Sequence, residues 1–215
     1  MFPVNTYDEI EKNEKIINEK HIVVLLFVRP SLPGAKEIID EFNYIHYNSG
    51  RFCSIYAVGY SSEENCRGHQ SWKPIERVAG VEWYYSDQVF VDFKERLECK
   101  LGWKYSGDIE MIVLQSNPSG RSVLNFENYL AIDVNYGIKN EYIESFPRFM
   151  EALVRSSRRE VETAGLTREM QRTRLKIGEI VRFSIDECRK IPLPVKRIIK
   201  DRLFYRTARH YSREG

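Results

Sequence analysis

The residues best placed for chemistry lie at one corner of the chain, in the stretch FVRPSLPGAKEII over residues 27–39. An apolar run ends there, Pro and Gly mark a turn at residues 30–34, and an amphipathic helix follows. Ser31 is a typical helix N-cap residue, and Arg29 lies two residues before it. Because the start of a helix offers free amide N–H groups, this pair predicts a binding site for a carboxylate or a phosphate.

A second candidate is the pair Cys66 and His69, whose spacing matches half of a zinc site. The other half is missing, because His21, His46 and His210 each stand alone in the sequence. We therefore predict a polar loop at this point, and we expect no metal and no cofactor.

Other common chemistries leave no signature. The adjacent acids Glu63 and Glu64, and the pair Glu95 and Glu98, fit solvated charges better than a general acid and base. The phosphate-loop, dinucleotide-binding and nucleophile-elbow motifs are all absent. We predict no catalytic residue, and we favour a protein that is not an enzyme.

Aromatic residues gather between residues 72 and 105 and suggest a contact surface instead. Trp and Tyr are over-represented among the residues that anchor interfaces. Trp72 has polar neighbours, and alternation along the chain turns Tyr84 outward, so these two are the predicted partner-binding aromatics. The remaining aromatics of this stretch are expected to line the core.

Composition describes an acidic body with a basic tail. The net charge of +2 over 215 residues conceals 17 Lys and Arg against 9 Asp and Glu in residues 151–215. The four cysteines are scattered, which favours reduced thiols in the cytosol over a disulfide framework. No apolar run approaches the roughly 20 residues of a membrane helix, and acidic residues near the start argue against a signal peptide. We expect a cytoplasmic protein that does not enter a membrane.

The elements that position the corner begin with a helix from Thr6 to about Lys20, opened by the capping pair Thr6 and Glu9. HIVVLLFV (21–28) predicts a strand buried on both faces, and a helix should follow from Ser31 to about residue 48. FCSIYAVGY (52–60) is the second predicted strand. A strand, a helix and a strand with short joints predict a right-handed crossover with two parallel strands in one sheet.

The second half of the body should contain a hairpin and two helices. Residues 61–80 are polar and lack a sustained period, which predicts a loop insertion. A helix capped at Ser86 should end at Gly102, and residues 109–115 and 122–134 should form two antiparallel strands. The last helix of the body is expected from Ser145 to near Gly165. Together these elements predict an α/β fold with a mixed sheet of about four strands.

This order resembles the thioredoxin fold over residues 6–164. In that family the first long helix begins with Cys-x-x-Cys, because the helix N-terminus stabilises a thiolate. Here Ser31-Leu32-Pro33-Gly34 takes that place, so Pro33 is retained while both sulfur atoms are lost. The family's cis-proline is also missing from the matching stretch 106–109. The resemblance thus implies a thioredoxin-like domain without redox activity. Glutathione transferases, which carry a similar domain and sometimes a serine at this corner, suggest an alternative: an enzyme using Arg29 and Ser31 on a thiol or anionic ligand.

Residues 165–215 predict a separate basic arm of two amphipathic helices around the hinge Pro192-Leu193-Pro194. Its predicted contact residues are Arg168, Arg172, Lys176, Arg182, Lys196, Arg197, Lys200, Arg202 and Arg206. Apolar stripes of this width usually bury against protein, so we favour a protein partner or a second copy of the chain. Nucleic acid is the second alternative, although no known nucleic-acid motif is present. A membrane-surface helix is the third, and the near absence of large aromatic residues from the apolar faces disfavours it.

Because the catalytic motifs are absent and the basic arm is suited to contact a protein, we predict a non-catalytic subunit or adaptor of a larger cytoplasmic protein assembly. The body also resembles uncharacterised bacterial proteins of thioredoxin shape that accompany defence operons, which implies an antiviral defence accessory. A nucleic-acid-binding accessory protein and an enzyme with an anionic ligand are the alternatives.

Overall fold

A computed structural model describes residues 1–50, 52–62, 66, 71–118, 120, 122–140, 143–165 and 204–205. Of the predicted basic arm (165–215), the structure describes Gly165, which ends a helix of the body, and the short strand Phe204–Tyr205. The prediction of helix is wrong at residues 204–205, because these two residues form a strand that pairs with the edge of the main sheet.

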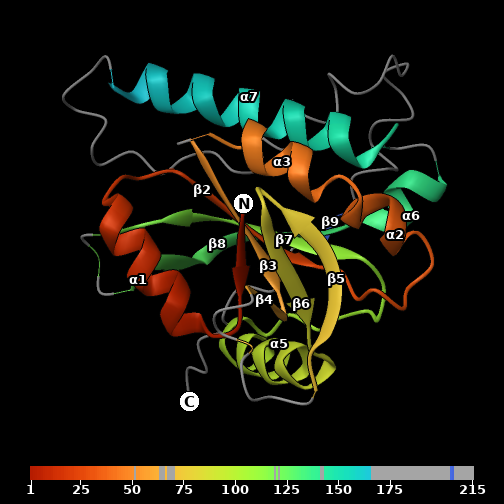
Figure 1. Ribbon diagram of the computed structural model, residues 1–215. Helices are drawn as coiled ribbons and strands as arrows, with labels where there is room; N and C mark the ends of the chain where they lie inside the picture. Colours follow the sequence, from red (N-terminus) through yellow and green to blue (C-terminus); the bar gives the residue numbers. More distant parts are fainter. Residues whose placement is uncertain are drawn as a thin grey trace, which may run out of the picture.

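The main sheet has six strands in the order β1-β3-β2-β7-β8-β9 (Figure 1). Their bounds are β1 Phe2–Val4, β2 Ile22–Phe27, β3 Cys53–Val58, β7 Glu110–Ser116, β8 Leu124–Asp133 and β9 Phe204–Tyr205. Strand β2 pairs in parallel with β3, which confirms that the two predicted strands are parallel neighbours in one sheet. Strand β7 is antiparallel to both β2 and β8, which confirms the predicted hairpin. The architecture is thus mixed α/β around a mixed sheet.

The core lies at the centre of this sheet. Every residue of β2, β3 and β7 is buried, which confirms the prediction that the apolar run at 21–28 is buried on both faces. Helices α3 (Phe42–Asn48) and α7 (Phe146–Gly165) lie on one side of the sheet, while α1 (Tyr7–Ile17) and α5 (Asp87–Leu101) lie on the other (Figure 1). Phe27 of β2 contacts the rings of Phe90 and Phe93, which holds α5 against the sheet.

A second sheet occupies much of the region predicted as a loop insertion. Strands β4 (Tyr60–Ser62), β6 (Val81–Tyr85) and β5 (Lys73–Val78) form a three-stranded antiparallel sheet in that order. The loop prediction for 61–80 is therefore wrong over β5 and over the last two residues of β4. Strand β5 was missed because it is a polar edge strand with Pro74 and an irregular register, whereas its partner β6 turns Trp83 and Tyr85 into the core.

The helices follow their predicted starts with one exception. Thr6 caps α1 and Ser86 caps α5, and Gly102 ends α5 in the left-handed conformation. The single helix expected from Ser31 is instead two short helices, α2 (Ala35–Ile39) and α3, separated by a turn at residues 40–41. The capping role of Ser31 is wrong, because Gly34 precedes α2 as its N-cap.

The remaining described helices lie after β8. A short helix that was not predicted, α6 (Val134–Lys139), begins directly after Asp133, whose carboxylate accepts a hydrogen bond from the Tyr136 amide at 2.7 Å. Helix α7 runs to Gly165, as predicted. None of the helices in the described ranges combines the length and the apolar character that crossing a membrane requires.

Candidate functional site

The corner that follows β2 places Arg29 against the start of α5. Its guanidinium donates to Asp87 Oδ1 at 2.8 Å, and the Tyr85 hydroxyl donates to the same oxygen at 3.3 Å. The hydrogen bond from Arg29 holds the pKa of Asp87 below its usual value. The guanidinium also lies 5.7 Å from the centre of the Phe90 ring, within the range of a cation–π contact. Arg29 therefore already has a carboxylate partner inside the protein.

The rest of the corner is a tight turn. The Leu32 amide donates to the Arg29 carbonyl and the Ala35 amide donates to the Leu32 carbonyl, so the helix begins only at Ala35. Ser31 is exposed on this turn, four residues before the first residue of α2. Gly34 has a φ of 80°, which L side chains rarely adopt. The structure thus separates Ser31 from the start of α2, and the anion-binding role of Arg29 and Ser31 stays a prediction.

A buried carboxyl, which the sequence did not indicate, lies at the same end of the sheet. Glu110 begins β7 and has no exposed surface. It accepts hydrogen bonds from the Trp103 indole N–H and from the Ser106 amide, each at 3.1 Å. Burial outweighs these bonds and raises the pKa of Glu110 to about 7. The group can exchange a proton near neutral pH, but it offers no surface to a substrate.

A second buried polar cluster joins α1 to the sheet. His21 Nε2 lies 2.8 Å from Ser54 Oγ and 3.0 Å from Glu14 Oε2, and the Tyr56 hydroxyl donates to Glu14 Oε1 at 2.7 Å. Burial by itself raises the pKa of Glu14, yet the hydrogen bond and charge of His21 and the bond from Tyr56 bring it below its usual value. Serine and carboxylate contact the same ring nitrogen and all four side chains are buried, so the cluster lacks the geometry and the access of a catalytic triad.

The cysteines are not part of a metal site among the described residues. Within the part of the chain that the structure describes, no three His, Cys, Asp or Glu side chains are grouped as a metal site would require. Cys66 is half-buried, and His69 lies outside the described residues. Burial raises the pKa of the Cys53 thiol to about 12, which makes it a poor nucleophile.

The predicted contact aromatics are half-buried instead of fully exposed. Trp72 immediately precedes β5, and Tyr84 lies in β6, where its hydroxyl donates to Glu82 at 3.0 Å. Their role in partner binding stays a prediction. The nine predicted contact residues of the basic arm, from Arg168 to Arg206, lie outside the described residues.

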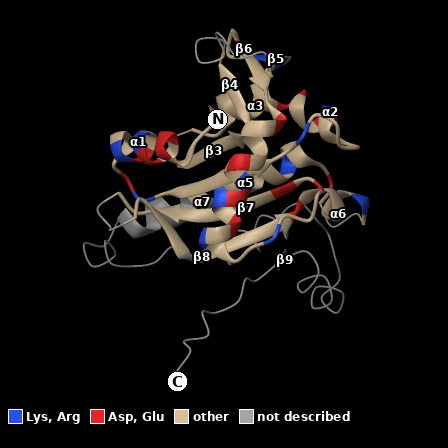
Figure 2. Cartoon of the chain, turned by 90° about the horizontal axis from the view of Figure 1, so that it is seen from below, with Lys and Arg blue, Asp and Glu red and all other residues tan. Residues whose placement is uncertain are grey.

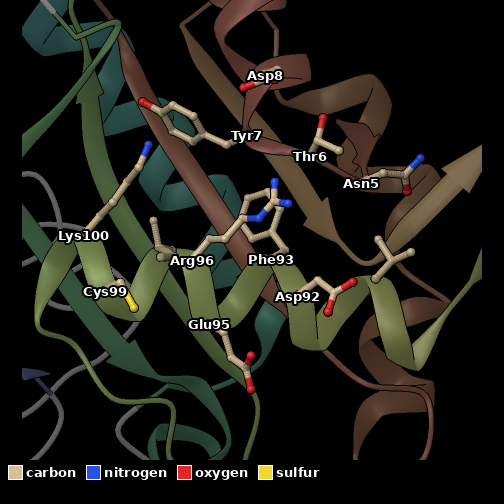
Figure 3. Close-up of a pocket in the computed structure, with 12 residues that line it drawn as sticks. Asn5, Thr6, Tyr7, Asp8, Asp92, Phe93, Glu95, Arg96, Cys99 and Lys100 are labelled. Atoms are coloured by element: carbon tan, nitrogen blue, oxygen red, sulfur yellow. The ribbon is translucent and has the colours of Figure 1, made fainter.

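A groove between α1 and α5 is the concave feature that the sequence missed (Figure 3). Its volume is about 680 Å³, within the usual range for small-molecule sites. It is lined by Asn5, Thr6, Tyr7, Asp8, Val89, Asp92, Phe93, Glu95, Arg96, Leu97, Cys99 and Lys100. The sequence signal available was the helical spacing of Val89, Phe93 and Leu97 on α5. The partner face on α1 could not be read from that spacing, because the two helices lie far apart along the chain.

Comparison of the chain with protein-family models, with curated proteins and with solved structures finds no match in any of the three. A functional proposal for this chain accordingly rests on its own residues and their geometry.

Proposed function

We propose that the chain is a thioredoxin-like protein without redox chemistry that serves as a non-catalytic subunit or adaptor of a larger cytoplasmic assembly. The order of elements supports the likeness: a parallel crossover unit, β2 to β3, comes first, and the hairpin β7-β8 with helix α7 follows. This is the order that the resemblance implies.

The observation that carries the proposal is the geometry of the corner after β2. Neither Ser31 nor Gly34 can exchange a disulfide, and the φ of 80° at Gly34 suits glycine at the position of the second cysteine. Arg29 is engaged by Asp87, and the nearby Glu110 has both oxygens hydrogen-bonded and no exposed surface. Because the turn after β2 has no sulfur atom and its charged groups are already paired, it favours binding of a partner over catalysis of a reaction.

The proposal is tested by reconstitution with the full chain. A partner recovered by affinity purification from the native host is expressed separately, and the two pure proteins are mixed and analysed by sedimentation velocity. We expect a complex of fixed stoichiometry that survives Ser31→Ala and Arg29→Gln, because neither side chain is needed for chemistry. The purified chain should also fail to reduce insulin disulfides.

Two results would overturn this function. The first is substrate turnover that disappears in Ser31→Ala or Arg29→Gln while the variant stays folded by circular dichroism. The second is the absence of any complex between pure components. A recovered nucleic acid whose affinity falls steeply with salt would replace the protein adaptor by the nucleic-acid alternative.

A further inference from the structure

The groove between α1 and α5 has a floor that can accept an apolar body. Val89, Phe93 and Leu97 lie four residues apart on α5 and line the groove. Val89 is half-buried, whereas Phe93 and Leu97 also pack in the core and expose only 4% and 2% of their surface at the base of the groove. Tyr7, at the start of α1, faces these residues from the other side (Figure 3). An apolar molecule placed here loses contact with water on two sides, which favours its binding.

Two cations point into this groove from α5. Figure 3 shows that the side chains of Arg96 and Lys100 extend from the helix toward α1. The Lys100 ammonium lies 3.6 Å from the centre of the Tyr7 ring, a cation–π contact that holds it at one end of the groove. Among the residues that the structure describes, neither Arg96 nor Lys100 forms an ion pair, whereas Lys94 on the same helix pairs with Glu98 at 3.3 Å.

Three carboxylates, Asp8, Asp92 and Glu95, also line the groove, and within the described part of the chain none of them forms an ion pair with Arg96 or Lys100. Glu95 points away from the groove in Figure 3, and Asp92 accepts a hydrogen bond from Gln88 at 2.8 Å. Asp8 lies on the α1 side, in the first turn of that helix. Acidic and basic residues occur together on both helices (Figure 2), so the attraction for an anion is local to the two cations and does not come from a charged face.

The geometry points to a binding site for an amphipathic organic anion, a molecule with an aromatic or aliphatic body and one acid group. The body would lie between Val89 and the Tyr7 ring, above the buried side chains of Phe93 and Leu97, and the acid group would accept hydrogen bonds from Arg96 and Lys100. This site is independent of the corner after β2 and of the proposed adaptor function.

The test uses the full chain and two fluorescent probes of similar shape. Anilinonaphthalene sulfonate carries the acid group, and N-phenylnaphthylamine lacks it. We expect saturable binding of one sulfonate probe per chain, and about five- to tenfold weaker binding in Arg96→Gln or Lys100→Gln, because a charge-assisted hydrogen bond is lost. Binding of the neutral probe should be weaker in the native chain and unchanged in these two variants. The matched control Lys36→Gln removes an exposed cation from α2 and should bind both probes as the native chain does.

A second variant locates the probe without changing charge. Val89→Trp adds a bulky ring at the groove and should weaken both probes, whereas Tyr47→Trp, at an exposed position of α3 outside the groove, should weaken neither. Circular dichroism and thermal unfolding confirm that each variant is folded. Equal affinity of the sulfonate probe for the native chain, Arg96→Gln and Lys100→Gln would overturn the proposal, and so would an absence of saturable binding. Either of these results would leave the proposed adaptor function standing, because that function is tested separately by formation of the complex with the partner.

Discussion

The buried carboxyl of Glu110 should make the stability of the protein fall as pH rises toward neutrality. In the folded chain this group holds its proton up to a pKa of about 7, whereas its ordinary value is 4.5. Between these two pH values the folded state binds more protons than the unfolded state, so the free energy of unfolding decreases as pH rises. The gap in pKa corresponds to about 3 kcal/mol that is present below pH 4.5 and lost above pH 7.

The variant Glu110→Gln isolates this effect because its amide has no proton to lose. One amide N–H will face a donor, either the Trp103 indole or the Ser106 amide, which adds a cost that does not depend on pH. Burial also raises the pKa of Asp133, the cross-strand neighbour of Glu110, but that group is present in both proteins and largely cancels. Relative to the native chain, the variant should therefore gain about 3 kcal/mol between pH 4.5 and pH 8.

Urea unfolding followed by tryptophan fluorescence, repeated at intervals of pH, measures this difference. The control Glu95→Gln changes an exposed carboxyl of α5, and its stability should run parallel to that of the native chain. Parallel curves for Glu110→Gln and the native chain would refute the reasoning, because they would mean that Glu110 titrates alike in the folded and unfolded states.

Two further predictions concern stability at constant pH. Gly59→Ala should destabilise by about 1–3 kcal/mol more than Gly80→Ala. The two glycines have similar left-handed φ angles, 83° and 81°, but a new Cβ at Gly59 would come within 2.7 Å of Phe90 on α5, whereas one at Gly80 would meet open space. Equal losses in thermal unfolding would show that α5 moves aside without cost. Tyr56→Phe should cost about 1–3 kcal/mol, since it leaves a buried oxygen of Glu14 without its donor. Tyr47→Phe, at an exposed ring, should change urea unfolding by less than about 0.5 kcal/mol. Equal effects of the two tyrosine variants would contradict this assignment.

Much of the sheet was predictable because its signals are local. The apolar run at residues 21–28 indicated a strand buried on both faces, residues 52–60 indicated a second strand, and the short joints between them predicted a parallel crossover. Ser86 and Gly102 bounded α5 correctly because a cap and a left-handed terminus depend on single residues. These features need no knowledge of distant partners.

The corner could not be predicted to the same depth. Ser31 has the side chain of a cap, yet Gly34 takes that position because its left-handed φ lets the chain turn before α2 begins. Strand β5 has too little apolar alternation to be distinguished from a loop, and it becomes a strand only because β6 offers an edge with which to pair.

The charged residues show most clearly why the sites could not be found by pattern alone. Arg29 appeared free for a ligand because its partner, Asp87, lies 58 residues away. Glu110 appeared to be an ordinary strand-end acid, and only the fold buries it beneath Trp103. For Arg96 and Lys100 the difference runs the other way. Their spacing on α5 is typical of a solvent-exposed helix face, yet α1, from the start of the chain, lies opposite this face and makes it one wall of a groove. The sign and position of a charge can be read from the sequence, but whether it is paired, buried or available depends on contacts between distant segments, so ligand sites built on such charges require coordinates.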